Sequence, residues 1–575
     1  MRWKILNYPP EKPEKITLEE VVEIILKNRG IEKTQQIKEF LNPLPPENFT
    51  AKDLGLKETE IRKAIAKIKK IIEERGKIIV YGDYDADGIC ATAILWENLY
   101  RLTTNVLPYI PERVNEGYGL NKETLKKLKE KFPDLKLIIT VDHGITAREK
   151  INYAHDLGIE VIVCDHHQRG EEKPICAAVI HTEKVCAAAI AWFVARELAT
   201  DYRPGITVKD KESAIVGSQS IVDYLDLVAI ATIADLEPLW GINRSFAKFG
   251  LEILNKTKRC GLLAIFEEAG IKPGKIGVYE VGYIIAPRLN AMGRLEHALE
   301  SLRLLCTTNC DKAKIIASKL GQTNKERQVL TEETTKHALE ICSKEKNGSK
   351  LIFVYHESYN QGIIGLVAGK LVEQYHRPAI VVARGEEYSK ASARSINGFN
   401  IIEAIRSYSE LLVEAGGHPM AAGFTIETDK LEVFKEKLIT LANTQIPDEF
   451  LEKTLKIDLF LPLELINLEL YQATEKLAPF GLGNPEPVFA SRAKIKGFKK
   501  IGDEGKHLRV LLSSTGSLNS LMLFSAVGFN QGELADQLKV DQEVEIAYTL
   551  VLNEWDGQKK IELKLKDLRC PTSTS

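Results

Sequence analysis

Three apolar segments of the chain each run directly into acidic or imidazole side chains. The first leads into Gly82-Asp83-Tyr84-Asp85-Ala86-Asp87-Gly88, the second into Asp142-His143-Gly144 and the third into Asp165-His166-His167. A fourth apolar segment carries Asp226 at its start and Asp235 near its end. Carboxylates and imidazoles bind divalent cations and transfer protons, so these segments are the first candidates for a reactive site.

Each cluster taken alone has an ordinary structural explanation, because Asp before Gly is common in turns and helix caps. Three clusters at neighbouring strand ends, however, would bring like charges close together, which is costly unless cations neutralise them. The set is rich in oxygen and imidazole and lacks thiolate, so Mn²⁺, or Mg²⁺ with less imidazole involvement, fits better than Zn²⁺. We therefore expect a divalent-metal site. Asp235 is the candidate of the fourth segment, and Asp226 is either a further ligand or only a helix-start residue.

The elements that must position these residues follow from the apolar pattern. Apolar runs alternate with Lys- and Glu-rich amphipathic stretches, a pattern typical of a doubly wound parallel sheet in an α/β protein. Open sheets of this kind bind ligands at the carboxyl ends of their strands. The runs are Ile78-Ile79-Val80, Leu137-Ile138-Ile139 and Val161-Ile162-Val163. The three motifs are therefore expected to meet at one edge of the sheet.

The rest of the chain predicts further parts. A Pro-free stretch predicts a long helix, and a strand-helix-strand pattern after it predicts a second, smaller α/β lobe. Short strands and a Trp555-Asp556-Gly557 turn near the C-terminus predict an OB-like β-barrel. We expect an N-terminal accessory arm at residues 1–56, a catalytic α/β domain at 57–310, the connecting helix at 311–346, the second lobe at 347–446 and the barrel at 447–572.

Composition limits the partners and the compartment. The 575 residues include 78 basic and 80 acidic side chains, for a formal charge of -2, so no net positive field attracts nucleic acid and any such contact must be local. No signal peptide or apolar run of roughly 20 residues is apparent, which predicts a cytoplasmic protein without a membrane contact. Nine scattered cysteines predict reduced thiols and not a zinc site.

The order of the acidic motifs resembles a known superfamily. Asp85-Ala86-Asp87, Asp142, Asp165-His166-His167 and Asp235 are similar to the four motifs of the DHH phosphoesterases. Similarity to the RecJ-type exonucleases of that superfamily continues in Ala286-Pro287-Arg288-Leu289-Asn290-Ala291-Met292-Gly293-Arg294, in Ser392-Ala393-Arg394, in Gly416-Gly417-His418 and in Pro479-Phe480-Gly481. The resemblance covers most of the chain from about residue 61 onward.

The resemblance implies an activity and a set of roles. It implies two-metal hydrolysis of single-stranded DNA from the 5′ end, with release of mononucleotides, in DNA repair and recombination. Metal ligands would be Asp85, Asp87, Asp142, His166 and Asp235, and catalytic residues would be Asp83, Asp165 and His167, with His167 at the scissile phosphate. Two Mn²⁺ ions are expected, with Mg²⁺ as the second choice. Single-strand-binding protein and a helicase are expected partners.

Substrate contacts are also implied by the resemblance, each beside a plainer alternative. The candidates are Arg113, Tyr118, Arg288, Asn290, Arg294, Ser392, Arg394 and His418, with Ser392 and Arg394 at the 5′-terminal phosphate. A single Arg often only pairs with a surface acid, Tyr118 could be a loop anchor and His418 could be part of a close-packing turn. Lysines around residues 494–509 predict either a DNA-binding face of the barrel or a solvated strand face.

Three departures from RecJ sequences stand out, and rival functions remain open. Tyr359-Asn360 replaces a usual Trp-His, His143 stands where Asn is common, and Cys186-Ala187-Ala188-Ala189 replaces a Gly-rich stretch. One rival is a DHH enzyme for short oligonucleotides, cyclic dinucleotides or pyrophosphate, which would resemble only the first two lobes. Another rival is a non-catalytic replication scaffold, but the intact acids in all four motifs argue against it. A third is a DNA-binding adaptor that uses only its barrel.

Overall fold

The structure is a computed structural model that describes residues 1–8, 16–113, 115–170, 174–201, 220–344, 348–515, 522–555 and 558–570. The chain divides into two compact units. One contains residues 49–237 and 249–453, and the other contains residues 1–48, 238–248 and 454–575. Among the described residues, no helix is both long enough and apolar enough to cross a membrane.

A five-stranded parallel sheet forms the first lobe of the larger unit. Its order is β3 (Val106–Tyr109), β2 (Lys77–Tyr81), β4 (Leu135–Val141), β5 (Glu160–Asp165) and β6 (Ala178–His181). The chain reverses its direction of winding between β2 and β4, and such a switch point is where doubly wound sheets bind ligands. The predicted doubly wound parallel sheet is confirmed.

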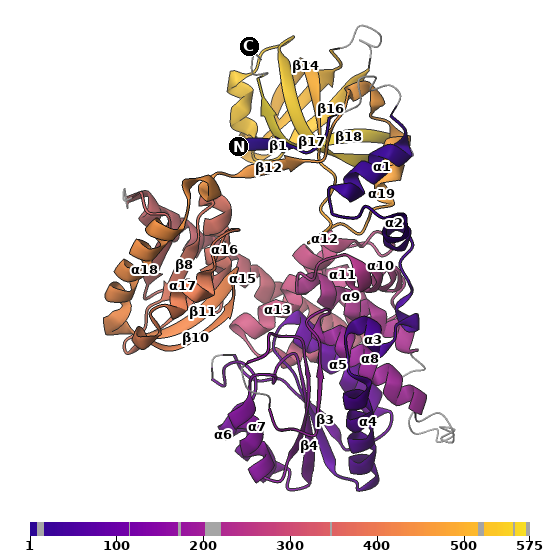
Figure 1. Cartoon of the computed structure of the whole chain (residues 1–575), viewed down its shortest axis with the longest axis vertical. Coiled ribbons are helices and arrows are strands. Elements are labelled where there is room, and N and C mark those ends of the chain that lie inside the picture. Colours follow the sequence, from indigo (N-terminus) through magenta and orange to yellow (C-terminus); the bar gives the residue numbers. More distant parts are fainter. Residues whose placement is uncertain are drawn as a thin grey trace. The chain divides into compact units, whose positions relative to one another are not determined.

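Helices cover both faces of this sheet (Figure 1). One face packs on α6 (Lys122–Lys131) and α7 (Arg148–Asp156) through a buried apolar cluster that includes Ile138 and Ile151. The other face packs on α4 (Glu58–Glu73), α5 (Ala86–Tyr100) and α8 (Ala187–Asp201). Because both faces are covered, the strands are apolar throughout, which explains the continuous runs in the sequence.

A helical region completes this lobe and leads out of it. Its helices are α3 (Ala51–Leu54), α9 (Leu225–Ala234), the part of α10 (Gly241–Leu254) after residue 248, α11 (Cys260–Ala269), α12 (Val278–Glu280), the π-helix η4 (Val281–Ile285), α13 (Ala286–Leu295) and α14 (Leu299–Cys306). Helix α15 (Cys310–Lys344), with 35 residues, occupies the stretch predicted to form the connecting helix.

One prediction about the cysteines is wrong. Cys260 and Cys310 form a disulfide, with their Cα atoms 5.0 Å apart. Each residue begins one of two helices that pack together, α11 and α15. The two positions are separated by 50 residues in the sequence, so spacing along the chain gave no sign of the pair. The other seven cysteines carry free thiols, as predicted.

The second lobe of the larger unit is a smaller mixed sheet with helices. Its strand order is β10 (Leu412–His418), β11 (Ala421–Glu427), β9 (Tyr388–Arg394), β8 (Ala379–Ala383) and β7 (Ile352–His356), and its helices are α16 (Ile364–Tyr375), α17 (Ile401–Arg406) and α18 (Leu431–Gln445). Strands β7 and β8 are parallel, as the strand-helix-strand pattern predicts, and the other pairs are antiparallel.

The smaller unit contains the predicted barrel. Its strands are β13 (Leu459–Phe460), β14 (Phe489–Ile501), β15 (His507–Ser513), β16 (Leu523–Gly528), β18 (Gln558–Arg569) and β17 (Glu543–Trp555), in that order, and the pairing of β14 with β17 closes the sheet. The OB-like barrel is thus confirmed. Asp556 and Gly557 of the predicted turn lie outside the described residues.

The N-terminal segment belongs to the barrel unit and does not form a separate arm. Strand β1 (Arg2–Ile5) pairs in parallel with β12 (Thr454–Ile457). Helix α1 (Leu18–Lys27) begins at a capping box formed by Thr17 and Glu20, and it buries its apolar face against the barrel core beside α19 (Leu468–Glu475) (Figure 1). Helix α2 (Thr34–Leu41) adds Phe40 to this core. An apolar helix face must be covered, but its periodicity does not say by which partner.

A buried arginine holds residues 238–248 in the same unit. The guanidinium of Arg244 lies 3.9 Å over the ring of Phe40. It donates hydrogen bonds to the carbonyl oxygens of Phe40, Leu477 and Ala478, at 2.7, 2.8 and 2.6 Å. These carbonyls satisfy a charge that would be costly to bury alone. The predicted boundary at residue 56 therefore differs from the two units of the structure.

Candidate metal centre

The acidic motifs follow the strands on either side of the switch point. Asp83 and Asp85 follow β2, and Asp85 caps the N-terminus of α5 by accepting a hydrogen bond from the Gly88 amide. Asp142 follows β4 with a φ of 70°, a backbone conformation that is strained for a residue other than glycine and is often found at functional sites. Asp165 ends β5. The structure therefore brings the predicted motifs to one edge of the sheet.

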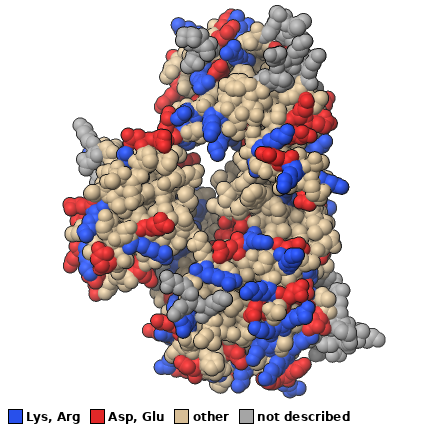
Figure 2. Space-filling model, viewed as in Figure 1, with Lys and Arg blue, Asp and Glu red and all other residues tan. Residues whose placement is uncertain are grey.

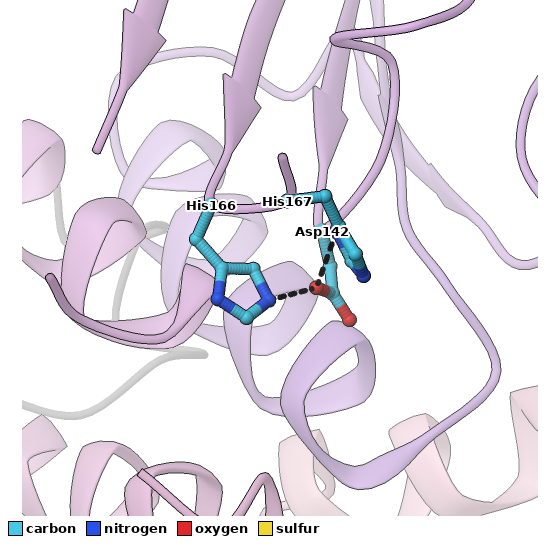
Figure 3. Close-up of side chains that lie close together, drawn as sticks. All are labelled: Asp142, His166 and His167. Carbon is cyan, nitrogen blue, oxygen red and sulfur yellow. Dashed lines mark hydrogen bonds and ion pairs between the residues drawn. The ribbon is translucent and has the colours of Figure 1, made fainter. Parts of the chain in front are cut away.

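His166 is surrounded by carboxylates from three different motifs. Its Nε2 atom lies 3.1 Å from Oδ1 of Asp142, 3.6 Å from Oδ2 of Asp235 and 3.8 Å from Oδ2 of Asp87. Figure 3 shows Asp142 between the rings of His166 and His167, and Nδ1 of His167 lies 3.9 Å from the same Asp142 oxygen. These distances place the side chains around a common space.

Three groups of side chains offer ligand atoms within 4.8 Å of one another. They are Asp142 with His166 and His167, Asp87 with His166 and Asp235, and Asp83 with Asp85 and Asp142. Asp142 and His166 each belong to two groups, so the three groups adjoin one another, and the Asp142 carboxylate has two oxygens that could serve adjacent cations. Oδ1 of Asp83 is buried and has no hydrogen-bond partner among the described residues, as expected of an oxygen that awaits a cation. The donor set therefore fits divalent metal.

The electrostatics of the acids support the same conclusion. Burial, and then the charge of Asp87, raises the pKa of Asp235 to about 8. Burial also raises the pKa of Asp87 to about 6 and holds those of Asp83 and Asp142 well above their usual range. So many buried carboxylates cannot all ionise unless cations neutralise them.

Asp87 is held by the start of a helix. Its two carboxylate oxygens accept hydrogen bonds of 2.7 Å from the backbone amides of Ala187 and Ala188, at the N-terminus of α8. The partial positive charge of a helix N-terminus favours a carboxylate there. The Cys186-Ala187-Ala188-Ala189 departure thus supplies the amides that orient a predicted metal ligand.

Asp165 orients the neighbouring histidine. Its carboxylate accepts hydrogen bonds from the amides of Ile145, His166 and His167 and from Nδ1 of His167, the last at 2.8 Å. Burial alone would raise the pKa of Asp165, but these bonds and the His167 ring together lower it to about 2. Asp165 is therefore an ionised carboxylate that holds the His167 ring.

Asp226 and Glu237, two acids of the fourth segment, lie in different surroundings: Asp226 lies away from His166, and Glu237 lies beside it. Asp226 begins α9, where it accepts a hydrogen bond from the Thr257 hydroxyl and lies 3.7 Å from Nε of Arg259, at the end of the helix away from Asp235. Glu237, which the sequence interpretation did not select, lies 3.6 Å from Nδ1 of His166. Leu236 between Asp235 and Glu237 has a φ of 58°, and only this turn reveals that Glu237 also faces the histidine.

Tyr118 and His143 lie beside Asp142. The Tyr118 hydroxyl donates a 2.9 Å hydrogen bond to the carbonyl oxygen of Asp142 and lies 3.4 Å from the ring nitrogens of His167. His143 is buried, and its Nε2 atom lies 3.0 Å from the carbonyl oxygen of Tyr81. Burial lowers the pKa of His143 to about 4. His143 therefore packs as a neutral ring, and Tyr118 reaches the site.

Arginines gather next to the acids. Burial and the charges of Arg113, Arg327 and Arg394 lower the pKa of Arg294 to about 10. Nη1 of Arg294 donates a 3.0 Å hydrogen bond to the carbonyl oxygen of Gly362, and the Arg113 guanidinium lies 5.0 Å over the Tyr84 ring. Arg327 was missed, because one cation on the charge-rich helix α15 carries no signal in the sequence. A cationic group of this kind suits phosphate.

The Asn360 departure supports this arginine group. The side-chain oxygen of Asn360 accepts a 2.7 Å hydrogen bond from the Gly362 amide. The carbonyl of the same Gly362 holds Arg294. The preceding Tyr359 is buried, and its hydroxyl lies 3.0 Å from Nδ1 of His337. Tyr359 and Asn360, which stand in place of the usual Trp-His, therefore both make specific hydrogen bonds.

The remaining predicted substrate residues differ in whether they lie near the metal centre or already have a partner elsewhere. The rings of His418 and His167 stack with centroids 6.2 Å apart, and Nη1 of Arg394 lies 3.4 Å from the Ser392 hydroxyl. Arg288 forms an ion pair with Glu268 at 2.6 Å, which is the plainer alternative for an arginine. Asn290 has a buried side-chain oxygen without a partner among the described residues. The structure thus brings His418 to the metal centre and directs Arg288 to an acid.

On the barrel, several predicted cations are already paired. Lys496 binds Asp541 and Lys500 binds Asp536, and blue and red side chains are interspersed on the visible face in Figure 2. One exposed aromatic was missed: Phe529 is 54% exposed, and Nζ of Lys564 lies 5.9 Å from its ring centroid. An exposed ring beside a cation is typical of surfaces that stack nucleic-acid bases.

Comparisons with known proteins agree with this architecture. Residues 77–232 match the DHH family, N-terminal domain; residues 348–444 match the DHHA1 domain; and residues 457–567 match the RecJ OB domain. The crystal structure of RecJ in complex with Mn²⁺ from Thermus thermophilus is 30% identical with a TM-score of 0.79, covering 100% of this chain and 80% of that one. A Mg²⁺ complex from the same organism has a TM-score of 0.75 at 28% identity, with 100% and 79% covered.

Curated relatives extend the similarity over nearly the whole chain. The single-stranded-DNA-specific exonuclease RecJ of Bacillus subtilis is 34% identical, over 99% of this chain and 70% of the relative. The enzyme of the same description from Thermus thermophilus is 32% identical, over 99% of this chain and 79% of the relative. Together with the three matched domains, these similarities show that the chain belongs to the RecJ family of single-stranded-DNA-specific exonucleases.

Proposed function

We propose that this protein is a metal-dependent exonuclease that degrades single-stranded DNA in the 5′ to 3′ direction and releases mononucleotides. The observation that carries the proposal is the ring of carboxylates from three motifs around His166, beside a group of partly buried arginines. Acids that hold cations and arginines that hold phosphate are the two requirements of phosphodiester hydrolysis. The names of the relatives supply the class of substrate.

The metal ligands of the proposal are Asp85, Asp87, Asp142, His166 and Asp235, with Asp83 as a supporting acid. Two divalent ions bound there would lower the pKa of a water molecule and stabilise the charge that develops at phosphorus. Asp87 is oriented by the α8 amides, and His166 by Glu237. Mn²⁺ is our first choice because the ligand set is rich in carboxylate oxygen, includes imidazole and lacks thiolate, and Mg²⁺, with less imidazole involvement, is the second.

The side chains around the ions have separate tasks. Asp165 fixes the ring of His167 by accepting from Nδ1, which leaves Nε2 for the scissile phosphate. Arg113, Arg294, Ser392 and Arg394 bind backbone or 5′-terminal phosphates, and Tyr118, His418 and Asn290 complete the contacts to substrate. The barrel contributes a further binding surface for single-stranded DNA. A cytoplasmic role in DNA repair and recombination, with single-strand-binding protein and a helicase as partners, completes the proposal.

The test is digestion of long single-stranded DNA labelled at either end, with Mn²⁺ or with chelator. Asp85→Ala is the variant, and Asp156→Ala, an exposed aspartate at the end of α7, is the matched control. We expect mononucleotides from the 5′ end only with metal and only in the native protein and the control. Cleavage of dinucleotides but not of long DNA would favour the small-substrate rival, and binding without cleavage would favour the scaffold.

A further inference from the structure

The edge strand β6 ends in a further histidine, His181. In the parallel pairing of β5 with β6, His181 lies opposite Asp165. The carboxyl ends of parallel strands share one edge of a sheet, so His181 is at the same edge as the acidic motifs. Only 7% of His181 is exposed. A buried polar ring needs hydrogen-bond partners, and the partners of this ring indicate its role.

His181 donates a hydrogen bond to the main chain of His167. Its Nε2 atom lies 2.7 Å from the carbonyl oxygen of His167. A carbonyl oxygen only accepts, so the hydrogen of the His181 ring is on Nε2. The bond joins the end of β6 to the turn that follows β5. His181 therefore holds the backbone of the residue that we place at the scissile phosphate.

Arg169 fixes the His181 ring from its other nitrogen. Nε of Arg169 donates a 2.9 Å hydrogen bond to Nδ1 of His181. A guanidinium can only donate, so Nδ1 of His181 is the nitrogen without a hydrogen, in agreement with the hydrogen on Nε2. Burial lowers the pKa of His181, and the charge of Arg169 adds to this effect, so the ring is neutral. Arg169 and the His167 carbonyl thus select the same tautomer.

His167 is held from two neighbouring strand ends. Its amide and its Nδ1 atom both donate to Oδ1 of Asp165, at 3.1 and 2.8 Å. An ionised carboxylate cannot donate, so Asp165 cannot hold the carbonyl oxygen of His167, and His181 supplies that bond. The two contacts together fix both the backbone and the ring of His167. Such support matters because an error of about 1 Å in the place of a reacting group can cost about 10²-fold in rate.

The end of β6 is itself tied to neighbouring helices. The hydroxyl of Thr182, directly after β6, donates a 2.7 Å hydrogen bond to the carbonyl oxygen of Leu54 at the end of α3. Within the strand, the amide of Val179 donates to the carboxylate of Glu60 on α4 at 3.0 Å. A side chain on a rigid element can hold another residue more exactly than a side chain on a loop can. His181 is presented from such an element.

We propose that His181 is a positioning residue for the exonuclease reaction, which holds the backbone of His167 while Arg169 fixes the His181 ring. The inference rests on the proposed function, because it requires His167 to act at the scissile phosphate. Neither His181 nor Arg169 is a proposed metal ligand or a proposed contact to DNA. Their loss should therefore slow the catalytic step and leave the binding of DNA nearly unchanged.

Steady-state digestion of single-stranded DNA by the full chain compares His181→Leu with His181→Gln. Leucine has no donor, whereas glutamine keeps an N–H donor at the end of a side chain of similar reach. We expect kcat to fall about 10–100-fold in His181→Leu with KM nearly unchanged, and most of this loss to be recovered in His181→Gln. The control is His155→Leu, which changes an exposed histidine near the end of α7. A native kcat in His181→Leu, or an equal loss in both variants, would overturn the proposal.

Arg169→Ala tests the same hydrogen bonds at an exposed residue, where folding is not at risk. We expect kcat to fall about 2–10-fold, and Arg62→Ala, at an exposed arginine on α4, should have no effect. Nitrogen NMR of the histidine rings measures the bonds without DNA hydrolysis. We expect a neutral His181 ring with its hydrogen on Nε2, assigned by its loss in His181→Gln, and a shift of its Nδ1 resonance in Arg169→Ala.

A hydrogen on Nδ1 of His181, or an Nδ1 resonance that Arg169→Ala leaves unchanged, would overturn the proposal whether or not the native protein cleaves DNA. A native protein that shows the expected resonances but releases no nucleotides would instead contradict the proposed function. The two failures are therefore distinguishable.

Discussion

Nδ1 of His167 donates a hydrogen bond of 2.8 Å to Oδ1 of Asp165. Because three backbone amides also donate to this carboxylate and its pKa is lowered to about 2, Asp165 is ionised at neutral pH. An ionised carboxylate only accepts, so the proton of the neutral His167 ring must be on Nδ1. The opposite nitrogen is thereby free to act at the substrate. The pair resembles the carboxylate-imidazole arrangement that sets a tautomer in hydrolases.

Asp165→Asn should lower kcat and leave KM nearly unchanged. The amide can donate to Nδ1 and so favour the wrong tautomer of His167, for which we expect a loss of about 10²–10⁴-fold in kcat. Steady-state digestion of single-stranded DNA measures both constants. Asp156→Asn is the control, because it removes the same charge from an exposed position. A wild-type kcat in Asp165→Asn would show that His167 does not depend on this bond.

Metal should stabilise the protein more as the pH rises. Without metal, Asp87 and Asp235 have pKa values raised from 3.8 to about 6 and about 8, so the folded state binds more protons than the unfolded state in this range. The stability of the chelated protein therefore falls as pH rises through it. Metal requires the ionised carboxylates and restores the stability.

Thermal unfolding between about pH 5 and about pH 8, with chelator or with Mn²⁺, measures this effect. We expect the difference in Tm between the two conditions to widen with rising pH. Asp85→Ala should reduce the difference at every pH, since it removes a ligand. A difference that narrows toward pH 8 would contradict the raised pKa values.

Gly293→Ala should disturb the first acidic motif, which is far away in the sequence but in direct contact in the structure. A Cβ atom on Gly293, in α13, would lie 2.4 Å from the carbonyl oxygen of Tyr84, between Asp83 and Asp85. We expect a loss of stability of about 1–3 kcal/mol and weaker Mn²⁺ binding, because the backbone of the motif must move.

Gly369→Ala, in α16, is the matched control for this substitution. No atom lies within 4 Å of a Cβ placed there, so alanine should be neutral or stabilise by up to about 1 kcal/mol. Chemical denaturation and metal titration of both variants measure the contrast. Equal effects of the two substitutions would show that the contact between Gly293 and Tyr84 is unimportant.

Glu97→Ala should strongly destabilise the larger unit. It removes the carboxylate that pairs with Arg259 at 3.0 Å, where both side chains are only 4% exposed. An uncompensated buried charge costs about 3–5 kcal/mol. Glu58→Ala removes an exposed partner of Arg62 one helical turn away and should cost about 0.5 kcal/mol or less. Urea unfolding followed by circular dichroism compares them, and similar midpoints would contradict the buried pair.

Local pattern was sufficient to locate the main elements and the acidic motifs that supply most of the candidate metal ligands. The strands before Asp85, Asp142 and Asp165, the long helix α15 and the barrel were predicted from apolar periodicity and turn residues, and the structure contains them. The convergence of the motifs was also predictable, because the carboxyl ends of neighbouring parallel strands share one edge of a sheet. These properties depend on residues that are close in the sequence.

Contacts between distant segments were decided only by the tertiary structure. The sequence did not show that β1 pairs with β12, that Cys260 reaches Cys310, that Glu237 joins His166 or that Arg288 pairs with Glu268. An apolar face or a buried charge requires a partner, and a cysteine can form a disulfide, but many segments of the chain could provide the other half. The packing of the whole fold selects the partner. A single sequence therefore shows that an apolar face or a buried charge needs a contact, but it does not show which segment provides that contact.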